Sequence, residues 1–238
     1  GYYSALTAAL FARPALRVAI RQGAAVRLPQ LARGLPPTPW LVVALVLALA
    51  SLSWTAVAAE PPGTLRVAFA DIGEGDMALI TTPGGHRIVV DGGKDPRRAA
   101  EVVGRALRFW QRSIDLVVLT HPHSDHVAGL TEILRRYDVH RVLERAVEYD
   151  SPQHIEWRRA VDAEDAEVVQ ARMGQRLTFD DGVILQVIGP PDRLLDQTES
   201  DTDNASVVLR LVYGNVSFLL TGDLFQDGEA FILRRGID

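Results

Sequence analysis

The sequence predicts an α+β fold in which two β-sheets pack face to face between outer helices, an αββα sandwich preceded by a transmembrane helix. Short apolar runs joined by turn signals such as Pro83-Gly84-Gly85 and Gly214-Asn215 indicate paired strands. Apolar residues at helical spacing between these runs indicate amphipathic helices. The expected strands are 65–69, 77–82, 87–91, 116–119, 141–143, 176–179, 183–188, 206–213 and 216–220, and the expected helices are 96–111, 127–137 and 153–165.

Charge divides the chain of 238 residues into two parts that meet near Glu60. Residues 1–59 contain five arginines and no acidic residue, whereas residues 60–238 contain 20 basic and 30 acidic residues, a net charge of −10. The chain has no cysteine, which excludes a structural zinc site built from thiolates. The acidic part has the size of one globular domain.

Residues 40–59 form an apolar stretch without a charged residue and predict a transmembrane helix. Twenty residues at about 1.5 Å each span about 30 Å, the hydrocarbon thickness of a bilayer. Trp40 and Trp54 would lie toward the two interfaces. A buried core helix and a removable signal peptide ending at Ala56-Val57-Ala58 are the alternatives.

Residues 1–39 are expected to hold the end of an earlier transmembrane segment and an Arg-rich cytoplasmic loop. The positive-inside rule places the arginines of residues 13–33 in the cytoplasm, so that residues 60–238 lie on the extracytoplasmic side of the plasma membrane. The chain starts with Gly1 and ends within or just after an expected helix, and we expect it to be a fragment of a longer membrane protein.

The most informative motif is His-Pro-His-Ser-Asp-His at residues 121–126, directly after the apolar run 116–119. In an extended loop alternate side chains point the same way, so His121, His123 and Asp125 converge, while His126 turns in as a helix begins. Imidazole and carboxylate groups suit Zn, Mn, Fe or Co. Four ligands in one loop favour two neighbouring ions and hydrolytic chemistry. The alternative is a surface loop that is rich in histidine.

A second acidic position lies at the end of the apolar strand 216–220, where Thr221-Gly222-Asp223 follows. Polar groups at the end of strands on a rigid sheet are commonly functional. The alternative for Asp223 is the N-cap of a helix over 225–235. The acidic segment 194–203 is interpreted as a solvated loop near the site, with an extra metal contact as the alternative.

The motif at 121–126 resembles the HxHxDH motif of the metallo-β-lactamase superfamily, and Thr221-Gly222-Asp223 resembles its later metal-bridging aspartate. The resemblance implies two divalent ions, Zn or Mn. It implies that His121 and His123 bind one ion, that Asp125 and His126 bind the other, and that Asp223 bridges them. It further implies that Asp125 is catalytic and orients the attacking water.

Three further segments resemble one family within this superfamily, the C-terminal domain of the DNA internalisation-related competence proteins of the ComEC type. They are Asp71-Ile72-Gly73-Glu74-Gly75-Asp76, Val89-Val90-Asp91-Gly92-Gly93 and Asn204-Ala205-Ser206-Val207-Val208-Leu209, and the resemblance covers residues 64–235. It implies that Asn204 and Ser206 contact substrate, although Asn204 is also a suitable cap for a turn. Asp71, Asp76 and Asp91 match family positions near the site, but the pattern of acids flanked by glycine favours ordinary hairpin turns.

The resemblance implies a metal-dependent nuclease that degrades DNA at the outer face of the membrane during uptake. Its partners would be the DNA strand or duplex, the membrane, other competence proteins and an upstream channel part of the same protein. A non-catalytic DNA-guiding module and an exported small-molecule hydrolase are the alternatives. The family usually supplies one more histidine after the Gly-Asp motif, and we expect that residue to lie beyond Asp238, with the domain truncated at its C-terminus.

Overall fold

The computed structural model describes residues 38–58, 63–108 and 110–236. The chain divides into two compact units, Gly1–Glu60 and Pro61–Asp238. Of residues 1–39, expected to hold the end of a transmembrane segment and an Arg-rich loop, residues 1–37 lie outside the described residues.

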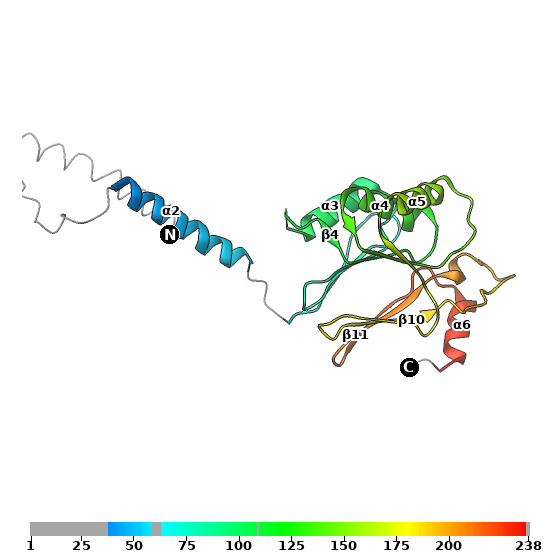
Figure 1. Ribbon diagram of the computed structural model, residues 1–238. Coiled ribbons are helices and arrows are strands. Elements are labelled where there is room, and N and C mark those ends of the chain that lie inside the picture. The colour runs from blue at the N-terminus through cyan, green and yellow to red at the C-terminus, as the bar shows by residue number, and fades with distance from the viewer. Residues whose placement is uncertain (1–37, 59–62, 109, 237–238) are drawn as a thin grey trace, which may run out of the picture. The chain divides into compact units, whose positions relative to one another are not determined.

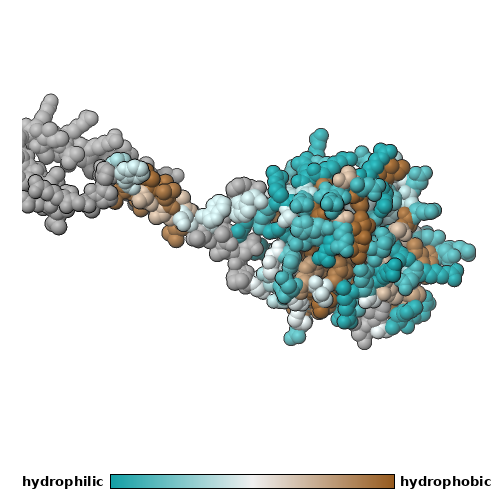
Figure 2. Space-filling model, viewed as in Figure 1, coloured by the Kyte–Doolittle hydropathy of each residue, from teal (hydrophilic) through white to brown (hydrophobic). Residues whose placement is uncertain are grey.

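The first unit contains helix α2 (Thr38–Ala58), whose visible surface is largely apolar (Figure 2). Its large apolar side chains, among them Trp40 and Leu52, are exposed. The structure describes the side chains of residues 39–54 of this helix, and among the described residues no helix is both long and apolar enough to cross a membrane. The membrane span over residues 40–59 is therefore not shown and stays a prediction.

The second unit is built on a six-stranded mixed sheet with the order β1-β2-β3-β5-β7-β8. The first three strands are antiparallel, and β3, β5, β7 and β8 run parallel. The strands are β1 (Arg66–Phe69), β2 (Ala78–Thr81), β3 (Arg87–Val90), β5 (Leu116–Val118), β7 (Arg141–Glu144) and β8 (Glu167–Gln170). Because β3 and β5 are parallel neighbours, the segments that follow them meet at the same edge of the sheet.

A four-stranded antiparallel sheet with the order β12-β11-β10-β9 packs against the first sheet (Figure 1). Its strands are β9 (Arg176–Thr178), β10 (Ile184–Gly189), β11 (Val208–Tyr213) and β12 (Val216–Leu220). Alternation within β3 shows how the layers form: Ile88 and Val90 enter the core between the sheets, and Val89 enters the core beneath the helices. Both faces of this strand are thus buried.

Helices α3 (Pro96–Ala106), α4 (Ser124–Arg136) and α5 (Pro152–Ala163) cover the outer face of the six-stranded sheet (Figure 1). Helix α6 (Gln226–Arg234) lies beside the second sheet and contacts β10 and the 3-10 turn η2 (Asp203–Ala205). The predicted sandwich of two sheets with outer helices is confirmed.

The sequence prediction differs from the structure chiefly in three short strands, in the end of α3, which lies at Ala106 rather than at 111, and in the start of α4. Strands β4 (Ser113–Ile114), β6 (Asp138–Val139) and β8 were not expected. Helix α4 begins at Ser124 rather than at 127, so Asp125 and His126 lie in its first turn and not in an extended loop. This shift changes which side chains of the histidine motif converge.

Candidate metal centre

The histidine motif follows β5 and enters α4 through His123, which is the N-cap residue of that helix. His121 and His126 are 2% and 1% exposed, and His123 is half-buried. Burial of two imidazoles at the edge of a rigid sheet requires partners for their ring nitrogens. These partners come from three distant segments of the chain.

One group consists of His121, His123 and Asp203, whose ligand atoms lie close together. Nε2 of His121 lies 3.1 Å from Nδ1 of His123, and Oδ1 of Asp203 lies 2.9 Å from the latter atom. Oδ1 of Asp203 is also 3.4 Å from Nε2 of His121. Despite these distances it is buried without a hydrogen-bond partner among the described residues, since neither contact has hydrogen-bonding geometry.

A second group consists of His121, His126 and Asp223. Oδ1 of Asp223 is 3.3 Å from Nε2 of His126, and Oδ2 of Asp223 is 3.9 Å from Nε2 of His121. His121 therefore belongs to both groups, and its ring lies 4.1 Å from that of His126, measured between centroids. We call the five residues His121, His123, His126, Asp203 and Asp223 the candidate metal centre.

Asp91 lies outside the two ligand groups and contacts His126 through Nδ1, the ring nitrogen that does not face Asp223. It follows β3, is 2% exposed, and its Oδ2 lies 3.0 Å from Nδ1 of His126. The same carboxylate accepts hydrogen bonds from the backbone N–H (2.9 Å) and the hydroxyl (2.7 Å) of Thr120. A carboxylate on the second ring nitrogen fixes the tautomer of a ligand histidine and turns Nε2 toward the ion. The sequence favoured a hairpin turn for Asp91, and the structure shows that this residue also contacts the ring of His126.

Gly222 allows the Asp223 loop to approach the end of β5. Its φ is +52°, and a Cβ at this position would lie 2.9 Å from the Thr120 side chain and 3.2 Å from Oγ of Ser206. Ser206 itself is fully buried, and its hydroxyl has no hydrogen-bond partner among the described residues. The predicted substrate residue Ser206 therefore lies beneath the Asp223 loop.

Asn204 is tied into the protein through its side chain. Its side chain is fully buried, and its Nδ2 donates to Oγ1 of Thr198 at 2.9 Å. Its Oδ1 accepts from the backbone N–H of Gly228 in α6 at 3.0 Å. Both polar atoms of the amide are used within the protein, which agrees with the alternative role of Asn204 as a cap for a turn, and its contact with substrate stays a prediction.

Asp125 does not join either ligand group, contrary to the expectation from an extended loop. It lies in the first turn of α4, where a carboxylate interacts favourably with the helix dipole. The turn around Gly75 packs against its backbone: a Cβ at Gly75 would lie 1.7 Å from the Asp125 carbonyl oxygen. The negative charge of Asp125 still reaches the centre, because it contributes to the raised pKa of His126.

The electrostatics of the centre favour a cation. Burial and the nearby His126 and His123 lower the pKa of His121 to about 2, so its imidazole is neutral and can act as a ligand. Burial opposes protonation of His126, but the hydrogen bond to Asp91 and the surrounding carboxylates outweigh it and raise its pKa to about 9. Burial and neighbouring acids, partly offset by His126, raise the pKa of Asp223. Crowded carboxylates of this kind are stabilised by a bound divalent ion.

The donor set fits such an ion. Imidazole nitrogens and carboxylate oxygens converge from His121, His123 and Asp203, and the orphaned oxygen of Asp203 points to a partner that is not a hydrogen-bond donor. The sequence indicated a metal contact from segment 194–203 only as the alternative and did not single out Asp203, because four acidic residues in this segment resemble a solvated loop. It missed the role of Asp91 although the available signal, an acid at the end of an apolar strand, is the one that marks Asp223.

Comparison with known proteins identifies the family. The family model described as the metallo-beta-lactamase superfamily matches residues 70–236. The chain belongs to this superfamily. Its members are in general metal-dependent hydrolases, typically with two ions, and the two ligand groups of the candidate centre agree with that chemistry.

Two curated relatives are competence proteins. The chain is 24% identical over 181 residues to ComE operon protein 3 of Bacillus subtilis, covering 68% of this chain and 22% of the relative. It is 29% identical over 199 residues to competence protein ComA of Neisseria gonorrhoeae, covering 84% of this chain and 25% of the relative. The chain thus spans about a quarter of the length of either relative.

Among solved structures, Rm3 metallo-beta-lactamase is similar with a TM-score of 0.43 and 20% identity, covering 68% of this chain and 60% of that one. Membership of the metallo-β-lactamase superfamily rests on the family match.

Proposed function

We propose that residues 60–238 form a metal-dependent phosphodiesterase that degrades DNA during its uptake by a bacterial cell. The convergence of His121, His123 and Asp203 carries this proposal, because the buried Oδ1 of Asp203 lies beside both imidazoles with no hydrogen-bond partner among the described residues, an arrangement that a cation would complete. The similarity to two competence proteins supports DNA as the substrate, as a single strand or as a duplex being taken up.

The side chains have separate roles in this proposal. His121, His123, His126, Asp203 and Asp223 hold two divalent ions, Zn or Mn, which when bound supply positive charge for a phosphodiester and acidify a water molecule. Asp125, at the start of α4, orients that water and accepts its proton. Asp91 orients the ring of His126 through its contact with Nδ1.

The location and partners extend the proposal. Residues 40–59 would anchor the protein in the plasma membrane, supported by the absence of any charged residue there and by the five arginines before it. The hydrolase domain would then lie on the extracytoplasmic side. It would act with an upstream channel part of the same protein and with other competence proteins, in line with its relatives.

The test is cleavage of labelled single-stranded and duplex DNA by the full chain with Mn²⁺ or Zn²⁺. His123→Ala is expected to lose at least about 100-fold in rate, since removal of one ligand costs several kcal/mol of charge stabilisation. His86→Ala, a histidine outside the candidate metal centre, is the matched control and is expected to retain activity. Equal rates for His123→Ala and the unchanged chain would refute the metal mechanism.

A further inference from the structure

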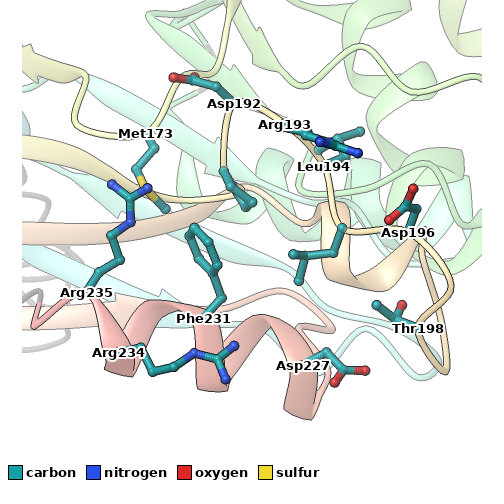
Figure 3. A pocket seen from close by; sticks show the side chains of 12 residues that line it. Met173, Asp192, Arg193, Leu194, Asp196, Thr198, Asp227, Phe231, Arg234 and Arg235 are labelled. Atoms are coloured by element: carbon teal, nitrogen blue, oxygen red, sulfur yellow. The ribbon is translucent and has the colours of Figure 1, made fainter.

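A cavity of about 520 Å³ lies outside the candidate metal centre, between the segment 191–198 and helix α6 (Figure 3). Phe231 rises from α6 toward that segment, as does Arg235 at the C-terminal end of this helix, and Met173 lies near Arg235 (Figure 3). Leu195 also lines the cavity. An aromatic ring with apolar neighbours and an adjacent cation is an amphipathic surface that suits a flat aromatic group carrying negative charge.

Three arginines line this cavity: Arg193, Arg234 and Arg235. The guanidinium carbon of Arg235 lies 5.2 Å from the centre of the Phe231 ring, which holds the cation beside the aromatic face. Among the described residues none of the three forms an ion pair, although three aspartates also line the cavity. The aspartates are Asp192, Asp196 and Asp227.

In a second large cavity, beside α3, two of the three arginines differ in this respect, and the third, Arg97, forms no ion pair among the described residues but has no aromatic residue in the cavity lining. There Arg98 pairs with Asp71 at 2.9 Å and Arg105 pairs with Glu101 at 3.2 Å. Their charges are already neutralised by the protein, whereas those next to Phe231 remain available to an anion. The domain carries a net charge of −10, so available cations beside an aromatic ring are a local exception to its overall field.

Asn204 links this cavity to the candidate metal centre. Its amide binds Thr198, which lines the cavity from one side, and the backbone of Gly228 in α6, which forms the other side. The residue before it is Asp203, whose carboxylate faces His121 and His123. A ligand that occupies the cavity therefore lies against the same two segments that position Asp203.

We propose that this cavity binds one nucleotide of a single-stranded DNA substrate, which rests on the proposed function. The base stacks on Phe231, and Arg193 and Arg235 bind the phosphate beside it. The aspartates accept hydrogen bonds from amino groups of the base. The cavity thereby holds the strand next to the metal centre in a domain whose overall charge repels DNA.

The experiment measures binding of a fluorescein-labelled oligodeoxycytidine of roughly 12 nucleotides, whose bases carry amino groups, to the full chain by anisotropy, in EDTA so that no cleavage occurs. Phe231→Leu is expected to weaken binding by about 5-fold to 100-fold, because stacking on an aromatic ring is lost while apolar volume is kept. Arg235→Gln is expected to weaken binding and to lower the slope of log affinity against log salt by about 0.7.

Two substitutions serve as matched controls. Phe69→Leu removes an exposed phenyl ring from β1, and Arg159→Gln removes a cation from the cavity between α4 and α5, which contains no aromatic residue. Both are expected to bind the oligonucleotide within 2-fold of the unchanged chain, about the scatter expected of a neutral change. Thermal unfolding of all four variants shows whether each one folds.

The proposal is overturned if Phe231→Leu and Arg235→Gln bind like the controls, or if the unchanged chain does not bind the oligonucleotide. If the same protein still cleaves DNA with Mn²⁺, this result contradicts only the nucleotide cavity and not the proposed phosphodiesterase function. Conversely, weakened binding in the two variants together with no cleavage under any metal supports the nucleotide cavity and refutes the phosphodiesterase.

Discussion

Two clusters of histidine and carboxylate groups in this domain contain the same residue types but differ in how their polar atoms are satisfied. In the candidate metal centre, Oδ1 of Asp203 lies near two imidazoles and accepts no hydrogen bond. In the cluster around His86, Nδ1 lies 3.1 Å from Asp115 and Nε2 lies 2.7 Å from Asp180, both in hydrogen-bonding geometry. We expect a cation to complete the first cluster, whereas a proton on His86 completes the second.

The geometry around His86 shows why a proton satisfies this cluster. Ionised carboxylates only accept hydrogen bonds, so an imidazole that binds one on each nitrogen must donate from both and carry a positive charge. Asp181, which is close to the same histidine, already accepts from the backbone N–H groups of Gly84 and Val183. Proximity of histidine and acid is thus a poor criterion for a metal site, and unsatisfied ligand atoms are a better one.

The largest expected effect is on metal content. His121 contributes to both ligand groups, so His121→Ala is expected to reduce binding from about two Mn²⁺ or Zn²⁺ ions per chain to less than one. Elemental analysis after equilibrium dialysis measures the stoichiometry. His86→Ala is expected to bind as many ions per chain as the unchanged protein. If both variants lose the same number of ions, the two clusters do not differ in metal binding.

The next effect concerns Asp91, which contacts the ring of His126 without belonging to a ligand group. Asp91→Asn is expected to lower metal affinity about 10-fold to 100-fold, because the amide holds the imidazole less firmly and in a less basic state. Isothermal titration with Mn²⁺ measures the change. Asp180→Asn makes the same chemical change beside His86, and a comparable drop there would contradict the assignment.

Backbone packing around the centre predicts an effect on stability. Gly75→Ala places a methyl group 1.7 Å from the carbonyl oxygen of Asp125 at a φ of +82°, whereas Gly174→Ala at a φ of +86° meets nothing within 4 Å. Both changes strain the backbone, by about 1–2 kcal/mol. Gly75→Ala is expected to lose about 1–3 kcal/mol more from overpacking, measured by urea unfolding. Equal losses would show that the Gly75 turn can move away from α4.

The smallest effect is the pH dependence of the His86 cluster. The hydrogen bond to Asp180, opposed by burial and reinforced by Asp115, raises the pKa of His86 above 6.5. A raised pKa stabilises the fold fully below pH 6.5, and the contribution disappears as pH rises through the folded-state pKa. His86→Ala is therefore expected to cost up to about 1 kcal/mol at pH 5.5 and less at pH 9, by urea unfolding. A larger loss at pH 9 would contradict a charged His86.

Much of the candidate metal centre was predictable from local sequence. The spacing of His121, His123 and His126 after an apolar strand indicates ligands, since a strand end presents its loop at the edge of a rigid sheet. The same reasoning identified Asp223. Helix start signals were too weak to show that α4 begins at Ser124, so Asp125 was expected to converge with His121 and His123 and instead lies in the first turn of the helix.

The sequence by itself determined the fold class, most strands and the chemistry of the site, because hydrophobic periodicity and closely spaced ligands are properties of neighbouring residues. Only the tertiary structure decided that Asp203 faces His121, that Asp91 supports His126, and that Asn204 is buried. Only it placed Phe231 beside available arginines. These relationships join segments far apart in the chain, and they depend on which strands are neighbours and where each loop returns to the sheet, which no local pattern records.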